Sequence, residues 1–294
     1  MAHITIAGGS GFIGSILSQA LSKQGHSVSV LTRKPNASNH VFWNPNNRQI
    51  DYTAISQTEV LINLCGENIF NGKWTTKRKQ ELTASRVKTT DFLFHSFENS
   101  TTLKHYVSAS GTDCYPLSEF KAKEEDAYSD NFIGQLVKDW EQSADQFKTI
   151  DKVKVTKMRI AMVLSNNSEA FTSLISLAKK KSLSALGTGT QPMNWVHISD
   201  LMGAFLHVIK AQLDGAFNVC AESLSNSEFN AQINTKLGTK PFFKHVPAWI
   251  LKLILGDRSM LLLSGTPADN SKIVSTEFHF KHPQLQQALD QLLD

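Results

Sequence analysis

The 294-residue sequence has few cysteines, no long apolar run and no acidic residue before Asp51. Its three cysteines (Cys65, Cys114 and Cys220) lie far apart and lack the spacing of metal ligands, which argues against a disulfide scaffold or a zinc module. No apolar run approaches the roughly 20 residues of a membrane span, and the N-terminus lacks the pattern of a signal peptide. We therefore expect a cytoplasmic protein that has no membrane partner and binds no structural metal.

The missing acids also locate the net charge of +4. The first fifty residues carry four bases (Lys23, Arg33, Lys34 and Arg48) and no acid, so the remaining 244 residues are neutral. Four charges spread over fifty residues of apolar pattern are too sparse for a nucleic-acid-binding arm. We expect no nucleic-acid partner. With 41% hydrophobic and 19% charged residues, the composition is typical of a globular protein with one large or two small domains.

A glycine-rich turn follows the first predicted strand. Residues 3–7 are apolar and β-branched, residues 13–21 have helical periodicity, and residues 27–31 indicate a second strand. The glycines of the turn fit both G-x-G-x-x-G and G-x-x-G-x-x-G, and such a turn lets backbone N–H groups approach a pyrophosphate at the helix N-terminus. Within a βαβ unit this motif predicts a dinucleotide site, the alternative being a structural turn. The turn consists of Gly8, Gly9, Ser10, Gly11, Phe12, Ile13 and Gly14.

The end of the second strand distinguishes between the two nicotinamide cofactors. An NAD site has an Asp or Glu about 20 residues past the glycines, which binds the ribose hydroxyls. Here the corresponding residues are Thr32, Arg33 and Lys34, with no acid nearby. Arg33 can bind a 2′-phosphate in bidentate fashion, and Lys34 adds charge, which favours NADP(H). The alternative is a solvated pair of loop charges.

The rest of the chain continues the alternation of strands and helices. Strands are predicted at 59–64, 104–108, 153–160 and 216–219, a hairpin at 41–51, and helices at 75–97, 131–147, 170–181 and from about 200 to 209. The sequence thus predicts an α/β Rossmann fold, a doubly wound parallel sheet with a small, mostly helical C-terminal lobe. We expect residues 1–165 to form the NADP-binding core, with the sheet completed by about 193–220, and residues 166–192 and 221–294 to form the substrate lobe.

The motifs resemble those of the atypical extended short-chain dehydrogenase/reductases, and within them the "epimerase family protein" (NAD-dependent epimerase/dehydratase-like) subfamily. The similarity runs nearly end to end. It includes the glycine turn, residues 63–69, Trp74, Arg78-Lys79, residues 85–87, 108–110, 139–141, 195–198 and 262–265. The resemblance implies a Rossmann core, NADP(H) binding and a small helical C-terminal domain, but no substrate. The cofactor-binding residues expected beyond the glycine turn, Arg33 and Lys34 are Asn63, Leu64, Cys65, Gly66, Glu67 and Ser108.

The usual catalytic pair of this superfamily, Tyr-x-x-x-Lys, is missing. None of the four tyrosines has a lysine four residues later. On the helix that should carry the pair, Phe132 or Ile133 stands in the tyrosine place and Leu136 or Val137 in the lysine place. The resemblance leaves two substitutes. Ser110 matches the catalytic serine position, and Tyr115 matches a tyrosine that follows it.

Each candidate site residue has a structural alternative. Ser110 and Tyr115 are expected to orient a substrate carbonyl, although Ser110 also suits a strand-end cap and Tyr115 a packing role. Arg86 and Trp195 are expected to contact the substrate. His197 is expected to be structural, at a strand-to-helix junction capped by Ser199 or Asp200.

The expected function is that of an NADP(H)-dependent oxidoreductase or epimerase-like enzyme. The substrate would be small and polar, with a nucleotide sugar as one candidate. Because the Tyr-x-x-x-Lys pair is missing, the alternative is a catalytically silent NADP(H)-binding sensor. The substrate's identity, the direction of the reaction and the oligomeric state stay open.

Overall fold

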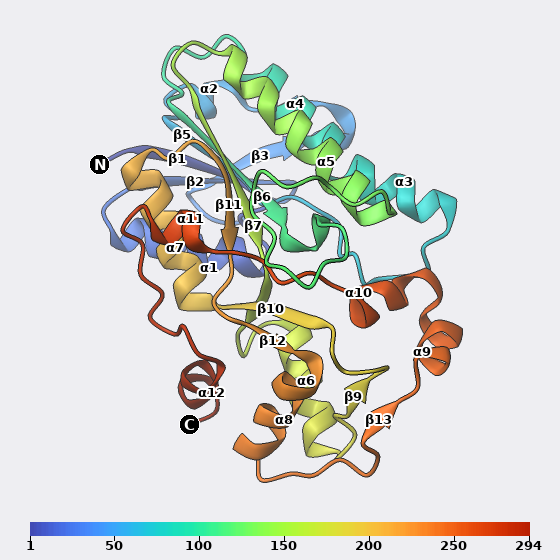
Figure 1. Ribbon diagram of the computed structural model, residues 1–294. Coiled ribbons are helices and arrows are strands. Elements are labelled where there is room, and N and C mark those ends of the chain that lie inside the picture. The colour runs from blue at the N-terminus through green and yellow to red at the C-terminus, as the bar shows by residue number, and fades with distance from the viewer.

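The computed structural model describes all residues, 1–294, and is built on one large sheet with helices on both faces (Figure 1). The strand order is β11-β7-β6-β5-β1-β2-β3-β4, and every neighbouring pair is parallel except β3 with β4. The predicted doubly wound Rossmann sheet is confirmed, and so is the small hairpin, whose strands are β3 and β4. The strands are β1 (His3–Ala7), β2 (Ser27–Thr32), β3 (His40–Asn44), β4 (Gln49–Ile50), β5 (Val60–Asn63), β6 (His105–Gly111), β7 (Lys154–Ile160) and β11 (Gly215–Val219).

Buried residues on both faces of the strands hold the layers together. Ile62 and Val107 face a core shared with α1 (Phe12–Lys23), α7 (Ile198–Ala211) and α11 (Ser271–Val274). Their neighbours Leu61 and Tyr106 face the opposite core, under α4 (Val87–Phe97) and α5 (Phe132–Asp145). Alternate residues therefore serve the two faces, as period-2 strands require, and near-continuous apolar runs are the result.

The helix expected over 75–97 is instead two helices, α3 (Thr76–Ala84) and α4, separated at Ser85 and Arg86. Thr75 caps α3, its side chain accepting the backbone N–H of Arg78. At the break, the Arg86 guanidinium donates to the backbone oxygens of Leu82 and Glu67, both at 3.1 Å. The second acceptor belongs to the loop after β5, so a tertiary contact accompanies the interruption.

A smaller lobe lies beneath the carboxyl edge of the sheet (Figure 1). It holds a three-stranded sheet, β12-β10-β8, and a parallel pair, β13-β9. Its elements are β8 (Met162–Leu164), α6 (Glu169–Lys179), β9 (Ala185–Leu186), β10 (Pro192–His197), β12 (Ser223–Ser225), α8 (Asn226–Lys236), β13 (His245–Val246), α9 (Ala248–Leu255), α10 (Met260–Leu263) and α12 (Leu285–Leu293). Outside it lies the short helix α2 (Tyr52–Ile55), and 3-10 turns occupy η1 (Pro45–Asn47), η2 (Thr112–Cys114), η3 (Gln146–Thr149) and η4 (Gly256–Ser259).

The expected division of the chain needs two corrections. Within 193–220 only β11 joins the large sheet, because β10 pairs with β8 and β12 in the lobe. Within 221–294, α11 returns to the large sheet, where Ile273 is fully buried against its core. The C-terminal segment therefore connects lobe and sheet across the carboxyl edge.

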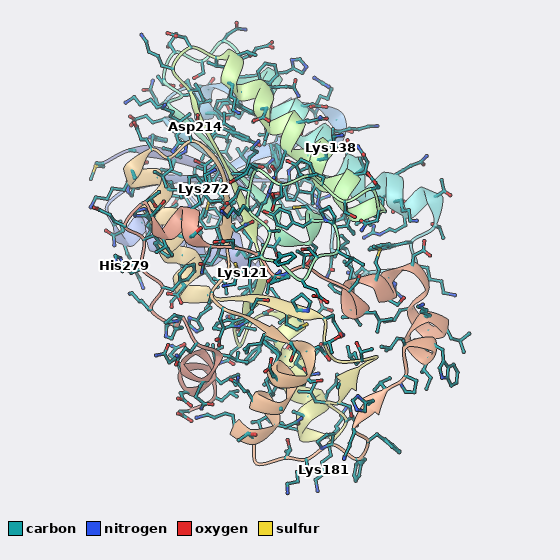
Figure 2. The ribbon with its side chains drawn as sticks, in the orientation of Figure 1. Lys121, Lys138, Lys181, Asp214, Lys272 and His279 are labelled. Carbon is teal, nitrogen blue, oxygen red and sulfur yellow. The ribbon has the colours of Figure 1, made fainter.

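The charged residues labelled in Figure 2 help to orient the molecule. Asp214, which directly precedes β11, marks the amino edge of the sheet, and Lys181, next to α6, lies at the far end of the lobe (Figure 2). Lys121 belongs to the long connection between β6 and α5 and lies between the two. No helix of the chain combines the length and the apolar character needed to cross a bilayer.

Trp195 belongs to the core of the lobe rather than to a surface that a substrate can reach. Its side chain is 0% exposed and packs in a cluster with Phe171, Phe229 and Leu289. The expectation that Trp195 contacts the substrate is wrong, because β10 runs through the middle of the lobe sheet and turns this residue inward.

This position yields a stability prediction. Trp195→Ala should lower the free energy of unfolding by about 3–5 kcal/mol, because it leaves a large cavity in a closed core. Trp249→Ala is the matched control, since Trp249 is 67% exposed on α9, and we expect a change within about 0.5 kcal/mol. Denaturant unfolding of both variants provides the measurement, and equal losses would contradict this assignment.

Candidate functional site

The sheet reverses its winding direction at β1, and the two loops on either side of that point meet there. From β1 the chain builds outward to β2 and β3, then returns to β5, β6, β7 and β11 on the other side. In open α/β sheets ligands bind outside the carboxyl ends of the strands at such a switch point. The glycine turn follows β1 and residues 64–67 follow β5, so both predicted cofactor segments lie at this point.

The glycine turn is packed too closely for side chains. Gly8 has φ +79°, and a Cβ there would lie 2.9 Å from the carbonyl carbon of Leu64. A Cβ on Gly14 would lie 2.3 Å from the backbone oxygen of Gly8. Any larger residue would push α1 away from the turn, or the turn away from β5.

The N-terminus of α1 is open to an anion. Its N-cap is Gly11, which supplies no side-chain hydrogen bond, and the first turn contains no acid. The leading N–H groups of this twelve-residue helix therefore have no capping side chain, and the helix dipole favours negative charge there. Ser10 and Gly11 are exposed, and Phe12 and Ile13 are half-buried. The turn presents backbone, rather than acidic side chains, to the solvent.

Arg33 and Lys34 follow the end of β2, and both are exposed. The Arg33 charge lies close enough to the Cys65 thiol to favour its thiolate. Burial has the larger effect and raises the pKa of Cys65 to about 12, so the thiol stays neutral. Cys65 is thus an uncharged part of the site, with a free guanidinium nearby.

Two of the residues predicted to bind the cofactor turn their side chains into the protein. Asn63 is 0% exposed and donates to Thr90 Oγ1 at 3.0 Å and Tyr106 Oη at 3.1 Å, while its Oδ1 accepts the Cys65 N–H. The Ser108 hydroxyl is buried and donates to the Ala109 backbone oxygen. The side chains of Asn63 and Ser108 are buried at the ends of β5 and β6. The segment that reaches solvent is Leu64 to Glu67.

Arg86 holds that segment in place. Its guanidinium lies against Gly66, where a Cβ would be 3.0 Å from Arg86 Cζ, and it stacks 5.1 Å from the Trp140 ring. With its donors used by Leu82, Ser85 and Glu67, the side chain is a loop clamp. The structure thus gives Arg86 a positioning role, and its expected contact with the substrate stays a prediction.

Ser110 and Tyr115 belong to one buried hydrogen-bond network. The Ser110 hydroxyl donates to Glu141 Oε1 at 2.6 Å, and the Tyr115 hydroxyl donates to Asn218 Oδ1 at 2.6 Å. Tyr115 also accepts from Arg159 Nη1 at 2.8 Å, and it is 4% exposed. Because β6 extends to Gly111, Ser110 lies within the strand and not beyond its end. Both hydroxyls are bonded within the protein, and their expected role of orienting a substrate carbonyl stays a prediction.

The centre of this network is an ion pair between Arg159 on β7 and Glu141 on α5. Arg159 donates twice to the carboxylate, from Nε at 2.8 Å and from Nη2 at 3.0 Å, and is 2% exposed. Burial by itself raises the pKa of Glu141, but the hydrogen bonds from Arg159 and Ser110 outweigh it and lower the pKa below its ordinary value. Sequence reasoning missed this pair. Its only signals were an arginine inside the apolar strand 153–160 and a glutamate on the buried face of a helix.

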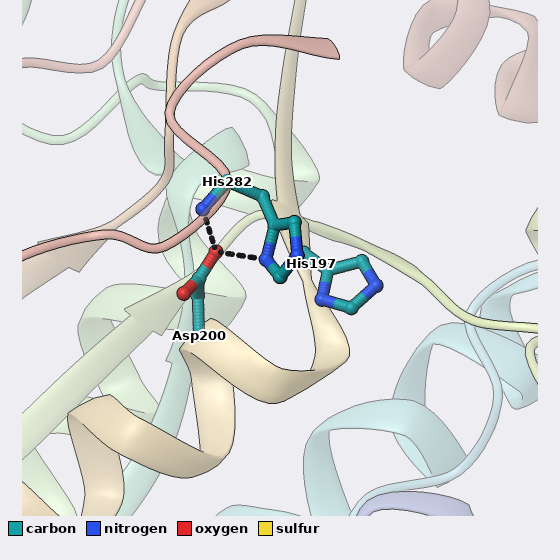
Figure 3. A group of neighbouring side chains, drawn as sticks. All are labelled: His197, Asp200 and His282. Carbon is teal, nitrogen blue, oxygen red and sulfur yellow. Dashed lines mark hydrogen bonds and ion pairs between the residues drawn. The ribbon is translucent and has the colours of Figure 1, made fainter. Parts of the chain in front are cut away.

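His197 is structural, as expected, but it caps the helix itself. Its Nδ1 accepts the backbone N–H of Ser199 at the start of α7. Asp200 accepts the backbone N–H groups of Lys281 and His282 and lies 3.2 Å from His282 Nδ1 (Figure 3). The ligating atoms of His197, Asp200 and His282 lie within 4.8 Å of one another. Asp200 thereby ties the C-terminal segment to α7.

Three cavities open around α3, α4 and the start of α5. One, about 690 Å³, lies along α3 and the start of α4 beside Phe132. A second, about 570 Å³, lies between the turn after β3 and helices α3 and α4, and reaches Glu67, Arg78 and Lys88. The smallest, about 30 Å³, lies where η2, the start of α5 and residues 260–266 meet. It is lined by Thr112, Asp113, Asn131, Ile133, Ser264 and Thr266, among others. Asp113 was not predicted. Its only sequence signal is an acid placed three residues after Ser110.

The model of the NAD dependent epimerase/dehydratase family matches residues 4–220, and that of a domain of unknown function, DUF1731, matches residues 246–292. An epimerase family protein of Staphylococcus saprophyticus is 31% identical, with 100% of each chain covered. The crystal structure of human epimerase family protein SDR39U1 with NADPH is 26% identical, has a TM-score of 0.87, and covers 99% of this chain and 98% of that one.

More distant structures share the fold alone. MoeE5 in complex with UDP-glucuronic acid and NAD is 19% identical with a TM-score of 0.79, covering 98% of this chain and 97% of that one.

The buried pair yields a prediction about stability. Glu141→Gln should lower the free energy of unfolding by about 3–5 kcal/mol at neutral pH, because it leaves Arg159 charged and unpaired in the interior. Replacing both partners, Glu141→Leu with Arg159→Met, should cost less than the single change. Denaturant unfolding of the three proteins provides the comparison, and a single variant as stable as the wild type would refute the role of the pair.

The same pair yields a pH dependence. Since the folded-state pKa of Glu141 lies below its unfolded value, its stabilisation is complete above the ordinary glutamate pKa and is lost as the pH falls through the folded value. Wild-type protein should therefore lose this contribution on acidification, and Glu141→Gln should lack that part of the loss. Unfolding free energies measured from neutral to acid pH test this, and parallel curves for the two proteins would contradict it.

Proposed function

The chain belongs to the NAD dependent epimerase/dehydratase family, and from this premise we propose that it binds NADP(H) and transfers hydride to or from a small polar substrate. Membership of this family establishes an NAD(P)-binding fold. The choice of NADP(H), the redox reaction and the substrate class are the proposal. The observation that carries it is the close-packed glycine turn at the uncapped N-terminus of α1, at the switch point of the sheet.

The residues at this edge suit a dinucleotide. The leading N–H groups of α1 would bind the pyrophosphate, and the close packing that Gly8 and Gly14 allow fixes the position of those groups. The loop from Leu64 to Glu67, held by Arg86, would line the path toward the ends of β5 and β6. A bound nicotinamide cofactor supplies hydride chemistry, while the protein supplies position and electrostatics.

The end of β2 favours NADP(H) over NAD(H). Arg33 and Lys34 are exposed and stand where an NAD site has its acid. An unpaired guanidinium can bind the 2′-phosphate through charge-assisted bonds. A relative crystallised with NADPH, human SDR39U1, supports this choice.

The substrate we propose is a small polar alcohol or carbonyl compound, with a nucleotide sugar as the first candidate. The family name and a fold shared with MoeE5, which was crystallised with UDP-glucuronic acid and NAD, motivate that candidate. A second function, a silent NADP(H) sensor, is favoured by one observation: α5 carries apolar residues where the superfamily has its Tyr and Lys. The two functions differ in whether the bound cofactor is consumed.

Replacing Arg33 tests the choice between NADP(H) and NAD(H). Arg33→Ala should weaken NADPH binding about 10- to 100-fold, the loss expected for hydrogen bonds to a charged group, and NADH binding less than about threefold. Lys23→Ala, which removes an equal charge from the last turn of α1, is the control and should change neither. Isothermal titration with both cofactors measures this, and equal losses for NADPH and NADH in Arg33→Ala would refute the assignment.

Binding and oxidation of NADPH by the wild-type protein distinguish the enzyme from the sensor. Saturating NADPH should stabilise the protein by mass action, about 2.7 kcal/mol at a hundredfold excess over Kd. It should also be oxidised in the presence of at least one member of a panel of carbonyl compounds and nucleotide sugars. Stabilisation without consumption on the whole panel would favour the sensor, and the absence of stabilisation would refute NADP(H) binding itself.

A further inference from the structure

The small cavity at the carboxyl edge lies where the superfamily's proton carrier would be. Ile133, one of the two residues that match the tyrosine place on α5, lines it. Leu136 and Val137, in the lysine place, are buried at 2% and 5% exposure. Helix α5 therefore brings no titratable side chain to this cavity, and a proton must come from another element.

Asp113 also lines the cavity, from a different element. It belongs to η2, directly after β6, and is exposed at the mouth. Whereas Glu141 and Asp200 are engaged in hydrogen bonds, the Asp113 carboxylate has neither a hydrogen-bond partner nor a base beside it. It is an unused carboxylate in a cleft.

The rest of the lining leaves Asp113 as the one free titratable group. From η2 and the segment after it come Thr112 and Tyr115, from α5 and its cap Asn131 and Ile133, and from the C-terminal segment no charged residue. Tyr115 is the only other titratable group, and its hydroxyl is bonded to Asn218 and Arg159. The cavity volume of about 30 Å³ suits one water molecule or one carbonyl group.

We propose that Asp113 is the catalytic acid/base of the hydride-transfer reaction, replacing the missing Tyr-x-x-x-Lys pair from another element that lines the same cavity. This inference rests on the proposed function. It assigns the proton to a loop after β6 and not to the helix that normally carries it.

The step is balanced in either direction. When an alcohol is oxidised, the Asp113 carboxylate takes the hydroxyl proton, the C–O bond becomes a carbonyl, and the carbon's hydride with its electron pair passes to the oxidised nicotinamide. In reduction, the hydride returns from the reduced nicotinamide to the carbonyl carbon, and the Asp113 carboxyl gives its proton to the oxygen. Because Asp113 is exposed, solvent restores its protonation state.

The kinetic test uses Asp113→Asn, which keeps the shape and removes proton transfer. We expect kcat to fall about a hundredfold to ten-thousandfold, with the NADPH dissociation constant unchanged and partial recovery in Asp113→Glu. The rate of oxidation should rise, and that of reduction fall, as the pH rises through the pKa of Asp113, and both limbs should be absent from Asp113→Asn. The control is Asp151→Asn, an exposed aspartate before β7 at the amino edge.

A second readout needs no turnover. In protein labelled with ¹³C at the aspartate carboxyls, the signal missing from Asp113→Asn identifies Asp113. That signal should shift when NADP⁺ is added, and not with adenosine 2′,5′-bisphosphate, which fills the nucleotide end alone. Equal shifts with both compounds, or none with either, would place Asp113 away from the nicotinamide and overturn the inference.

The outcomes separate the inference from the function on which it rests. Wild-type turnover retained in Asp113→Asn overturns the role of Asp113 and leaves the proposed function intact. A wild-type protein that binds NADPH but consumes none overturns both, in favour of the sensor. Loss of turnover with unchanged cofactor affinity, loss of the pH limbs and a nicotinamide-dependent carboxyl shift together support the inference.

Discussion

The buried ion pair between Arg159 and Glu141 is the contact around which the carboxyl edge is organised. A guanidinium that is 2% exposed has to be fully hydrogen-bonded, and this one bonds to side chains from α5, from the loop after η2 and from the segment before α5. Through Tyr115 and Asn218 the network extends to β11 and to the backbone of Ala122 and Asp269. One charge on β7 thereby fixes loops that are far apart in the sequence, because leaving it unpaired would cost several kcal/mol.

A second constraint acts at the glycine turn. Gly8, Gly14 and Leu64 are packed so closely that β1, α1 and β5 have one relative placement. The uncapped helix N-terminus is then held at a fixed position beside Arg33 and the loop from Leu64 to Glu67. The two constraints act on different parts of the carboxyl edge. The glycines fix where a cofactor's phosphates can bind, and the ion pair fixes the loops around the place proposed for the nicotinamide.

The sequence predicts best what depends on local pattern. The strand, glycine turn and helix of the first unit are read from consecutive residues, and the doubly wound sheet from the alternation of strands and helices. What could not be predicted depends on contacts between distant residues. The helix break at Arg86 involves the carbonyl of Glu67, and the inward turn of Trp195 follows from its partners Phe171 and Leu289. The resemblance matched Ser110 to a catalytic serine and Tyr115 to a tyrosine that follows it, but only the fold reveals Arg159 and Glu141 beside them. A motif match locates a residue on an element and leaves the direction of its hydrogen bonds open.

The missing Tyr-x-x-x-Lys pair and the ion pair with Arg159 both concern helix α5. Helix α5 has Phe132 or Ile133 in the tyrosine place and Leu136 or Val137 in the lysine place, and one turn further it supplies Glu141 to Arg159. The helix has thus become an anchor for the floor of the site. The ion pair also fixes the loop that carries Asp113. Asp113 is only two residues from Tyr115, and the hydroxyl of Tyr115 is bonded to Arg159. In this arrangement the residue that would carry the proton and the residues that hold it in place belong to different elements. Changes in the ion pair should therefore reach the chemistry through the loop, and not through α5.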